Sequence, residues 1–309
     1  MVEQHMKQFK KVIADIKSLK IRGAKNVAVE ATKALRHILV MAPQISRDGL
    51  LHNLEDARKE LFKTRPTEPA MRNALSFVLS GVNDPGTKED LIDHVDKMIA
   101  SVLQYFEEAQ QKIVEIGKHK IRDGSVVFTH CHSSTVTQIL IQAKKEGKRF
   151  EVHNTETRPS FQGRITAKEL SDKGIPVMHF VDSAARYALK KADLFLIGAD
   201  AITSEGKLIN KVGSELFAEA ARRFDVPVYV CTHAWKFDPK TALGFEEEIE
   251  IRQAKEIWDN PPKNVKIYNY AFEQVDPSLV AGVISELGIY KPQIFIQEVK
   301  KKYDWMFKN

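Results

Sequence analysis

The chain has 309 residues but only two cysteines, Cys131 and Cys231. So few thiols favour a reducing compartment and make a structural disulfide the less favoured interpretation. No apolar run approaches the roughly 18 residues of a membrane-spanning helix, so we expect no membrane span. The first residues, MVEQHMKQFKK, lack the apolar stretch of a secretory signal, and we therefore expect a cytoplasmic protein.

The sequence also lacks a basic arm and any basic stretch with interleaved aromatic residues. Its 47 Lys and Arg against 41 Asp and Glu give a net charge of +6, but the two signs are mostly interleaved. A solvated surface is the simplest interpretation and a positive pocket for an anionic substrate the next, while nucleic-acid binding is not expected. Without a GxGxxG or Walker A motif, dinucleotide and NTP binding lose their best support.

Residues 1–120 have the apolar spacing of helices throughout. Clear helical patterns cover 50–62, 71–79 and 88–117, after two earlier helices separated by the IRGA segment at 21–24. The turn residues at 83–86 precede Thr87, whose hydroxyl can cap the next helix. We therefore expect an N-terminal helical domain.

From residue 121 short apolar runs alternate with helical patterns. The expected strands are 125–129, 150–153, 176–181, 194–198 and 227–231, and the expected helices are 134–146, 166–173, 183–190, 213–224 and 277–287. This alternation predicts a Rossmann-like α/β domain over 121–309, with a mainly parallel sheet covered on both faces. A small hairpin is expected at 202–209, and an irregular surface excursion at 238–266.

The segment VVFTHCHSSTVT, residues 126–137, predicts a buried strand that runs into a helix with Cys131 at the joint. Ser133 and Ser134 offer N-cap hydroxyls. A helix N-terminus lowers the pKa of a nearby thiol, so we expect a reactive thiolate, with a buried inert thiol as the alternative. A zinc site with His130 and His132 is disfavoured, because adjacent positions of a strand point to opposite faces and no CxxC or HExxH motif is present.

The carboxyl ends of parallel strands meet at one edge of a sheet, where open α/β folds bind ligands. That edge is expected to collect His130, Cys131, His132, Asn154, Glu156, Thr157, Arg158, Asp182, Asp200, Thr232, His233 and Lys236. A thiol, carboxylates and several cations together suit acid–base chemistry on an anionic small molecule.

Asp200 follows the apolar strand in LFLIGADAI. It either caps the next element or, in apolar surroundings that raise its pKa, acts as a neutral acid. Asp182, in HFVDSAAR, is expected to cap a helix that begins at Ser183.

Two arginines, Arg65 and Arg158, each precede a proline, which suits either a surface turn or a rigid contact with phosphate. Gly163 and Gly213 precede helices, where bare backbone can approach an anion.

Several motifs together resemble one known family. They are TETRPSFQGRITAKEL (155–170), IPVMHFVDSAAR (175–186), LIGADAI (196–202), GKLINKVG (206–213), HAWKF (233–237) and DPSLVAGVISELG (276–288), with IRGA and TRP in the helical part. The family contains the alpha, beta and delta subunits of translation initiation factor 2B, methylthioribose-1-phosphate isomerase and archaeal ribose-1,5-bisphosphate isomerase. THCHS and the first two motifs are most similar to the last of these.

The resemblance implies roles for particular residues. Cys131 would accept a proton and Asp200 would donate one. Substrate would be bound by Arg22, Gly23, Ala24, Lys25 and Arg65 from the helical domain, and by Thr135, Val136, Thr137, Arg158, Asn210, Lys211 and Lys236 from the other. Lys25 stands where the family leads us to expect a small residue, and Ser134-Thr135 where it leads us to expect Lys-Ala.

The activity implied is the isomerisation of ribose 1,5-bisphosphate to ribulose 1,5-bisphosphate in AMP degradation, without metal or cofactor. Its implied partners are a phosphorylated pentose, AMP as a candidate effector, and further copies of the chain in an oligomer of dimers such as a hexamer. A methylthioribose-1-phosphate isomerase and a regulatory subunit of initiation factor 2B without turnover remain the alternatives.

Overall fold

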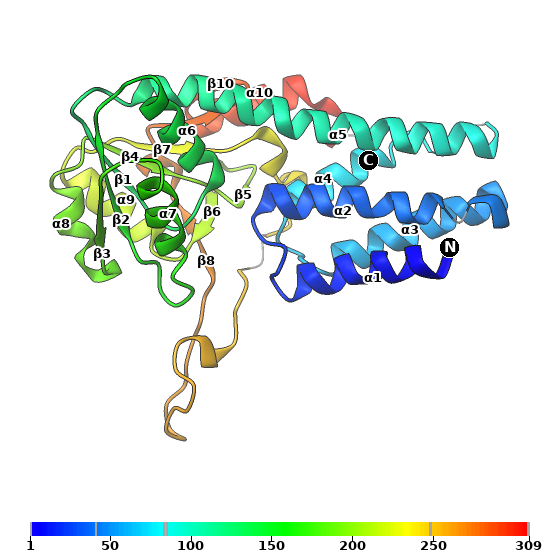
Figure 1. The fold of residues 1–309 in the computed structure, drawn as a ribbon, viewed down its shortest axis with the longest axis horizontal. Coiled ribbons are helices and arrows are strands. Elements are labelled where there is room, and N and C mark those ends of the chain that lie inside the picture. Colours follow the sequence, from blue (N-terminus) through cyan, green and yellow to red (C-terminus); the bar gives the residue numbers. More distant parts are fainter. Residues whose placement is uncertain (1, 41, 83, 85, 247–248, 308–309) are drawn as a thin grey trace. The chain divides into compact units, whose positions relative to one another are not determined.

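The computed structural model describes the chain except for residues 1, 41, 83, 85, 247–248 and 308–309. The chain divides into two compact units, Met1–Glu108 and Ala109–Asn309. Figure 1 shows helices alone in the first unit and a sheet with helices in the second. In the described part of the chain, no helix is long and apolar enough to cross a membrane.

The first unit consists of helices, as the apolar spacing predicts. They are α1 (Val2–Lys17), α2 (Ala24–Leu39), α3 (Arg47–Phe62), α4 (Pro69–Val78) and the first part of α5 (Lys88–Gly117). Helix α2 packs against α1, α3 and α4 through small and aliphatic side chains such as Val27, Ala31 and Leu35. The N–H of Asp90 donates to the Thr87 hydroxyl at 3.1 Å, so Thr87 caps α5 as expected.

A seven-stranded sheet organises the second unit, in the order β10-β9-β7-β4-β1-β2-β3. Its strands are β1 (Val126–Thr129), β2 (Glu151–Thr155), β3 (Val177–Phe180), β4 (Leu194–Ile197), β7 (Val228–Cys231), β9 (Gly282–Ser285) and β10 (Gly288–Tyr290). All neighbours are parallel except β10, which is antiparallel to β9. The mainly parallel α/β fold is confirmed.

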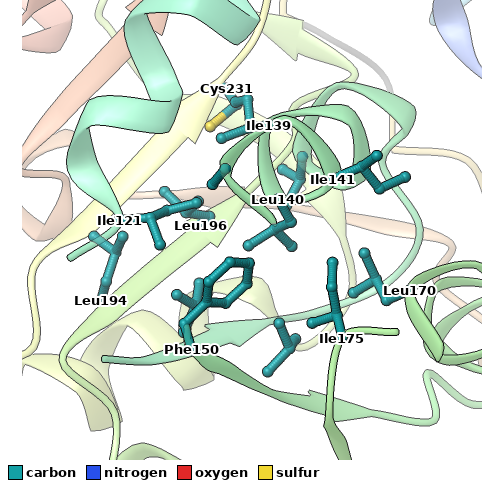
Figure 2. Close-up of a cluster of buried hydrophobic side chains, with 14 of the residues drawn as sticks. Ile121, Ile139, Leu140, Ile141, Phe150, Leu170, Ile175, Leu194, Leu196 and Cys231 are labelled. Atoms are coloured by element: carbon teal, nitrogen blue, oxygen red, sulfur yellow. The ribbon is translucent and has the colours of Figure 1, made fainter. Parts of the chain in front are cut away.

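Helices cover both faces of this sheet, because alternate residues of its buried strands point to opposite sides. The helices are α6 (Ser134–Lys145), α7 (Gln162–Ser171), α8 (Ala185–Leu189), α9 (Ser214–Arg223) and α10 (Pro292–Lys302). Val127 faces the apolar cluster beneath α6 and α7, part of which Figure 2 shows. Phe128, the next residue, packs edge-on against Phe217 of α9 at 6.0 Å between ring centroids.

A second sheet has three antiparallel strands, β5 (Ala201–Ile202), β6 (Leu208–Lys211) and β8 (Phe272–Val275), in the order β5-β6-β8. The hairpin expected at 202–209 is confirmed as β5 and β6. Between β7 and β8, the described residues of 238–266 hold only short 3-10 turns and one isolated bridge, as expected for an excursion.

The helix expected at 277–287 is wrong. Asp276 does cap the segment, since its carboxylate accepts from the N–H of Ser278 at 2.7 Å, but only one 3-10 turn, Pro277–Leu279, follows. The chain then enters β9, which pairs in parallel with β7, and turns into β10. Val283 and Ile284, the apolar residues at the centre of β9, are β-branched, and the sheet offers them a buried place beside β7.

Candidate active site

The joint between β1 and α6 is tightly held around Cys131. Its backbone N–H donates to the Thr157 hydroxyl at 3.0 Å, and its carbonyl accepts from the Thr166 hydroxyl at 2.9 Å. The thiol Sγ is 3.6 Å from Oε1 of Gln162, to which it donates. Cys131 adopts a left-handed backbone conformation with φ +67°, and Ser133, two residues later, is the N-cap of α6. These bonds fix where the thiol points.

The lowered thiol pKa expected at this joint is wrong. Burial raises the pKa of Cys131 to about 11, because the side chain is only 8% exposed and the charged thiolate would lose its water. The positive charge of Lys211 lowers this pKa, while Asp200 and Asp182 raise it. The residue also lies outside the first turn of α6, where the helix N-terminus would favour a thiolate most.

Asp200 lies beyond the end of β4, next to the end of β1. The register pairs Thr129 with Leu196, so both strands end at the same edge of the sheet. The Asp200 carboxylate is near enough for its charge to act on the Cys131 thiol. It is partly exposed and accepts no hydrogen bond from any residue that the structure describes, so a capping role has no support. Its own N–H donates to the carbonyl of Ile209 in β6 at 2.8 Å.

Lys211, at the end of β6, brings a buried positive charge to this edge. Its side chain is 6% exposed, and its Nζ lies 4.5 Å from the centroid of the Phe272 ring. Within the described residues, no carboxylate lies within ion-pair distance of the ammonium group. Asn210, beside it, donates from Nδ2 to the Ser214 hydroxyl at 2.9 Å. A buried cation without an acidic partner suits an anionic ligand.

The start of α6 supplies three further predicted residues, Thr135, Val136 and Thr137, all buried. Ser133 caps this helix as expected, through its hydroxyl and the N–H of Val136 at 3.4 Å. The Thr135 hydroxyl donates to Oε1 of Gln110 at 3.4 Å.

Lys236 follows β7 by five residues, and its ammonium donates to the carbonyl of Ala199, which precedes Asp200. The ends of β1, β4 and β7 in the large sheet therefore bring Cys131, Asp200 and Lys236 to one edge, and the end of β6 in the small sheet brings Lys211 near the end of β1.

Asp182 has a different role from the expected helix cap. Its carboxylate accepts from the backbone N–H groups of Thr157 and Arg158, at 2.8 and 2.7 Å. It therefore holds the loop after β2 that contacts the N–H of Cys131. Arg158 itself is exposed, lies 5.1 Å from the centroid of the Phe161 ring and donates to the carbonyl of Ile257 at 3.2 Å.

The two histidines beside Cys131 have separate partners. His130 bonds Thr155 and the carbonyl of Val212, at 2.7 and 3.0 Å, while His132 lies 3.1 Å from the Thr166 hydroxyl. The described residues contain no group of three or more His, Cys, Asp or Glu arranged to hold a metal ion.

The two glycines expected to face an anion differ. A Cβ at Gly163 would lie 1.7 Å from the carbonyl oxygen of Thr155, so only glycine fits where α7 meets β2. Gly213 precedes α9, but a carboxylate of the protein already occupies that helix start. Glu273 of β8 accepts from the N–H of Glu215 at 2.7 Å, and also from the N–H groups of Gly213 and Ser214.

Five predicted substrate-binding residues belong to the helical unit. Gly23, with φ +84°, is the N-cap of α2, and Ala24 and Lys25 begin that helix, with Arg22 exposed just before it. Burial lowers the pKa of Lys25, against the opposing effect of Glu107. Arg65 is buried and pairs with Glu68 at 2.8 Å. Their role toward a ligand stays a prediction.

Sequence reasoning placed Thr157 at this edge without a particular role, and did not single out Gln162 or Glu273. The first two lie within the motif at 155–170, whose resemblance to known proteins was the available signal. Their contacts with Cys131 depend on the loop after β2 folding back over the end of β1. Glu273 reaches α9 from a strand 58 residues away from Glu215, and no local pattern marks it.

The fold is that of an α/β protein with a Rossmann-like sheet, and its strand ends place a thiol and a carboxyl group at one candidate site. The model of the Initiation factor 2 subunit family matches residues 20–292, and the chain belongs to this family. It is 35% identical to the ribose 1,5-bisphosphate isomerase of Methanocaldococcus jannaschii over 301 residues, 97% of this chain and 96% of that protein. Identity to the enzyme of the same name from Pyrococcus furiosus is 36% over 302 residues, 95% and 93% of the two chains.

More distant relatives have other names. The methylthioribose-1-phosphate isomerase of Thermosipho melanesiensis is 29% identical over 98% of this chain and 92% of its own length. A crystal structure described as translation initiation factor eIF-2B of Pyrococcus horikoshii OT3 has a TM-score of 0.81 and 30% identity, covering 94% of this chain and 99% of that one. The family and the expected resemblance to ribose 1,5-bisphosphate isomerases are confirmed, and sugar phosphate isomerases are among the relatives.

Proposed function

We propose that the protein is an aldose–ketose isomerase that converts ribose 1,5-bisphosphate to ribulose 1,5-bisphosphate. The observation that supports this most is the placement of a thiol, Cys131, and a carboxyl group, Asp200, beyond the ends of adjacent parallel strands. A base and an acid on one sheet edge suit proton transfer between neighbouring carbons of a sugar. The names of the Methanocaldococcus jannaschii and Pyrococcus furiosus relatives agree with this substrate.

In the proposed reaction, Asp200 in its neutral form donates a proton to the ring oxygen as the bond from C1 to that oxygen breaks. The Cys131 thiolate removes the proton from C2, which leaves a double bond between C1 and C2. The proton of the C2 hydroxyl returns to Asp200 as the ketone forms, and the thiol returns its proton to C1. Both groups end in their starting states, and no electron leaves the sugar.

The phosphates would be bound by fixed positive charge and free backbone N–H groups. Lys211 is buried beside the thiol, Lys236 stands beyond β7, and the start of α6 offers the N–H groups of its first turn. From the helical unit we propose Arg22, Gly23, Ala24, Lys25 and Arg65, and Arg158 from the loop after β2. Since the neutral thiol must ionise before it acts, the nearby Lys211 has a second role in favouring the thiolate.

The direct test is incubation of the pure protein with ribose 1,5-bisphosphate, followed by NMR of the products. We expect signals of ribulose 1,5-bisphosphate, and none of that product with the Cys131→Ser variant under the same conditions. Parallel incubation with methylthioribose 1-phosphate tests the alternative substrate, which the Thermosipho relative supports. Turnover of the monophosphate alone would replace our substrate assignment but keep the acid–base mechanism.

A regulatory role without turnover is the second candidate, supported by the eIF-2B description of the Pyrococcus horikoshii structure. It predicts no product from either sugar phosphate at any pH at which the protein stays folded. Folding of the sample is verified by a thermal melt, so that absence of turnover in a folded protein would favour this role.

We further propose that the reaction serves AMP degradation, that AMP acts as an effector, and that the protein is a homo-oligomer of dimers, such as a hexamer. Light scattering at working concentration tests the assembly, and a monomer would contradict it. Titration of AMP into the isomerase assay tests the effector, with a change in kcat or KM as the expected result.

A further inference from the structure

His130, the residue before Cys131, has no part in the proposed proton transfers, yet it is almost completely buried in the site. Its ring lies between two strand ends. Nδ1 is 2.7 Å from the hydroxyl of Thr155 at the end of β2 and 3.4 Å from that of Thr157, and Nε2 is 3.0 Å from the carbonyl oxygen of Val212 after β6. The edge of the Phe217 ring closes the remaining side, with 4.8 Å between ring centroids.

These partners determine the protonation of the ring. A carbonyl oxygen only accepts hydrogen bonds, so Nε2 must hold the proton that is donated to Val212. Nδ1 is then free to accept from the Thr155 hydroxyl, as a neutral imidazole does. Burial agrees with this state, because it lowers the pKa of His130 to about 4. In the neutral ring, Nε2 is therefore the hydrogen-bond donor and Nδ1 the acceptor.

The carbonyl that His130 binds belongs to the residue next to Lys211. The N–H of Val212 donates to the carbonyl of Ala271 beside β8 at 3.2 Å, so that the backbone of Val212 is held through both its N–H and its carbonyl group. Gly213 then turns with φ +103°, and a Cβ there would lie 3.2 Å from Nε2 of His130. The ring thus connects the end of β6 in the small sheet to the end of β1 in the large one.

We propose that His130 is a positioning residue that holds the Lys211 ammonium beside the Cys131 thiol by bonding the carbonyl of Val212. Its importance for catalysis rests on the proposed function, but the arrangement itself can be tested without substrate. The charged groups that act on the thiol are Lys211 at the end of β6, Asp200 after β4 and Asp182 after β3. Asp182 and Lys211 also act on His130. Of these, only Lys211 favours the thiolate.

The test is the rate of alkylation of Cys131 by iodoacetamide at about pH 8, where the rate is proportional to the fraction of thiolate. Mass spectrometry of the peptide that contains Cys131 gives this rate directly. Cys231 is an internal control, because it is fully buried and should react only if the protein opens. The variants are His130→Asn, which lacks a donor at the Nε2 position, and His130→Gln, whose amide can still reach Val212.

We expect His130→Asn to slow the alkylation of Cys131 about tenfold, the equivalent of one pKa unit, and His130→Gln to restore most of the rate. In a Lys211→Met background, the same His130→Asn change should have little further effect, because the charge that it displaces is gone. The proposal would be overturned if His130→Asn slowed alkylation as much in the Lys211→Met background as in wild type. It would also be overturned if His130→Asn did not slow alkylation in wild type. If His130→Asn does not fold, Thr155→Val in both backgrounds tests the same link from the other ring nitrogen.

The isomerase assay on the same variants separates this proposal from the proposed function. If the substitutions at 130 and 211 have coupled effects on the alkylation rate but the protein shows no turnover, the positioning role is kept and the isomerase function is rejected. If the protein turns over substrate without that coupling, the isomerase function is kept and the positioning role is rejected. With both, kcat/KM should fall about tenfold in His130→Asn, in step with the alkylation rate, and be mostly restored in His130→Gln.

Discussion

The two cysteines of the protein lie in regions that look alike in sequence and differ in chemistry. Cys131 follows β1, Cys231 ends β7, and both strands are short apolar runs of the same parallel sheet. Cys231 lies within the apolar cluster of Figure 2, among aliphatic side chains, and burial alone raises its pKa. Cys131 is also buried, but hydrogen bonds hold its backbone and its thiol, and three charged side chains act on it.

The difference shows that burial does not decide whether a thiol is inert. A cysteine inside an apolar cluster has no group to stabilise its thiolate, whereas one beyond the strand ends meets side chains from several elements. At Cys131, Lys211 comes from the small sheet and Asp200 from the neighbouring strand. The chemistry of the site is thus a property of the sheet edge and not of one segment.

Replacing each cysteine by serine should give the largest difference between the two regions in kcat and in stability. Cys131→Ser should lower kcat about 10³-fold with folding intact, because a hydroxyl is nearly isosteric but is a far weaker acid than a thiol. Cys231→Ser should keep kcat per folded molecule and lower stability by about 1–3 kcal/mol, since it places a hydroxyl among aliphatic side chains. Steady-state kinetics and urea unfolding measure both. A Cys131→Ser variant with more than a tenth of wild-type kcat would show that the thiol is not the base.

Asp200→Asn tests whether the carboxyl group near Cys131 takes part in proton transfer. The amide keeps the size and hydrogen bonding of a neutral acid but cannot transfer a proton, so kcat and kcat/KM should fall together, by about 10²- to 10⁴-fold. Kinetics on ribose 1,5-bisphosphate beside a thermal melt measure this. Near-wild-type kinetics would remove the catalytic role, and a large melt shift with unchanged kinetics would make Asp200 structural.

Most of the fold follows from apolar periodicity, but the end of the sheet does not. Segment 277–287 begins with a capping Asp and a proline, as helices do, yet it forms β9 after one 3-10 turn. Val283 and Ile284 pair with Val230 and Cys231 in β7, a partner some fifty residues earlier in the chain. Pairing of this range is a tertiary effect that local propensity does not report.

In the site, the sequence places Cys131 and Asp200 at the sheet edge but not their surroundings. The dipole of α6 suggested a lowered thiol pKa, whereas the burial of the Cys131 side chain has the larger effect. The anion at the start of α9 is supplied by Glu273, and the partner of Asp182 is the loop after β2. Each of these contacts joins segments that only the folded chain brings together.

Lys211→Met should remove the charge that distinguishes the surroundings of Cys131 from those of Cys231. Loss of a charge-assisted contact of about 1.5–3 kcal/mol should lower kcat/KM for the bisphosphate roughly 10- to 100-fold. Lys207→Met is a matched control on the same hairpin, because Lys207 is more exposed and pairs with Glu205 at 2.5 Å. Equal effects of the two substitutions would show that Lys211 contributes only to the general charge of this surface.

The smallest expected effect, about tenfold per pH unit, is the pH dependence of kcat/KM. Burial holds the Cys131 pKa at about 11, so the thiolate is a small fraction at neutral pH and grows as pH rises. In Asp200→Asn, where no loss of the acid's proton opposes this rise, the residual kcat/KM should therefore increase with pH across the neutral range instead of reaching a plateau there. Because kcat/KM reports on the free enzyme, a plateau near neutrality would mean that its thiol has the low pKa that the sequence suggests.

Stability gives an independent measure of the same shift, with a definite sign. Because the pKa of Cys131 is raised from 9.0 to about 11 on folding, the neutral buried thiol stabilises the fold fully below 9.0, and that contribution is lost as pH rises toward 11. Cys131→Ser lacks this titration, so the free energy of unfolding of wild type relative to the variant should fall across that interval. If the difference in free energy of unfolding between wild type and Cys131→Ser stays constant with pH, the thiol is not held neutral. Cys131 would then lose its main likeness to Cys231.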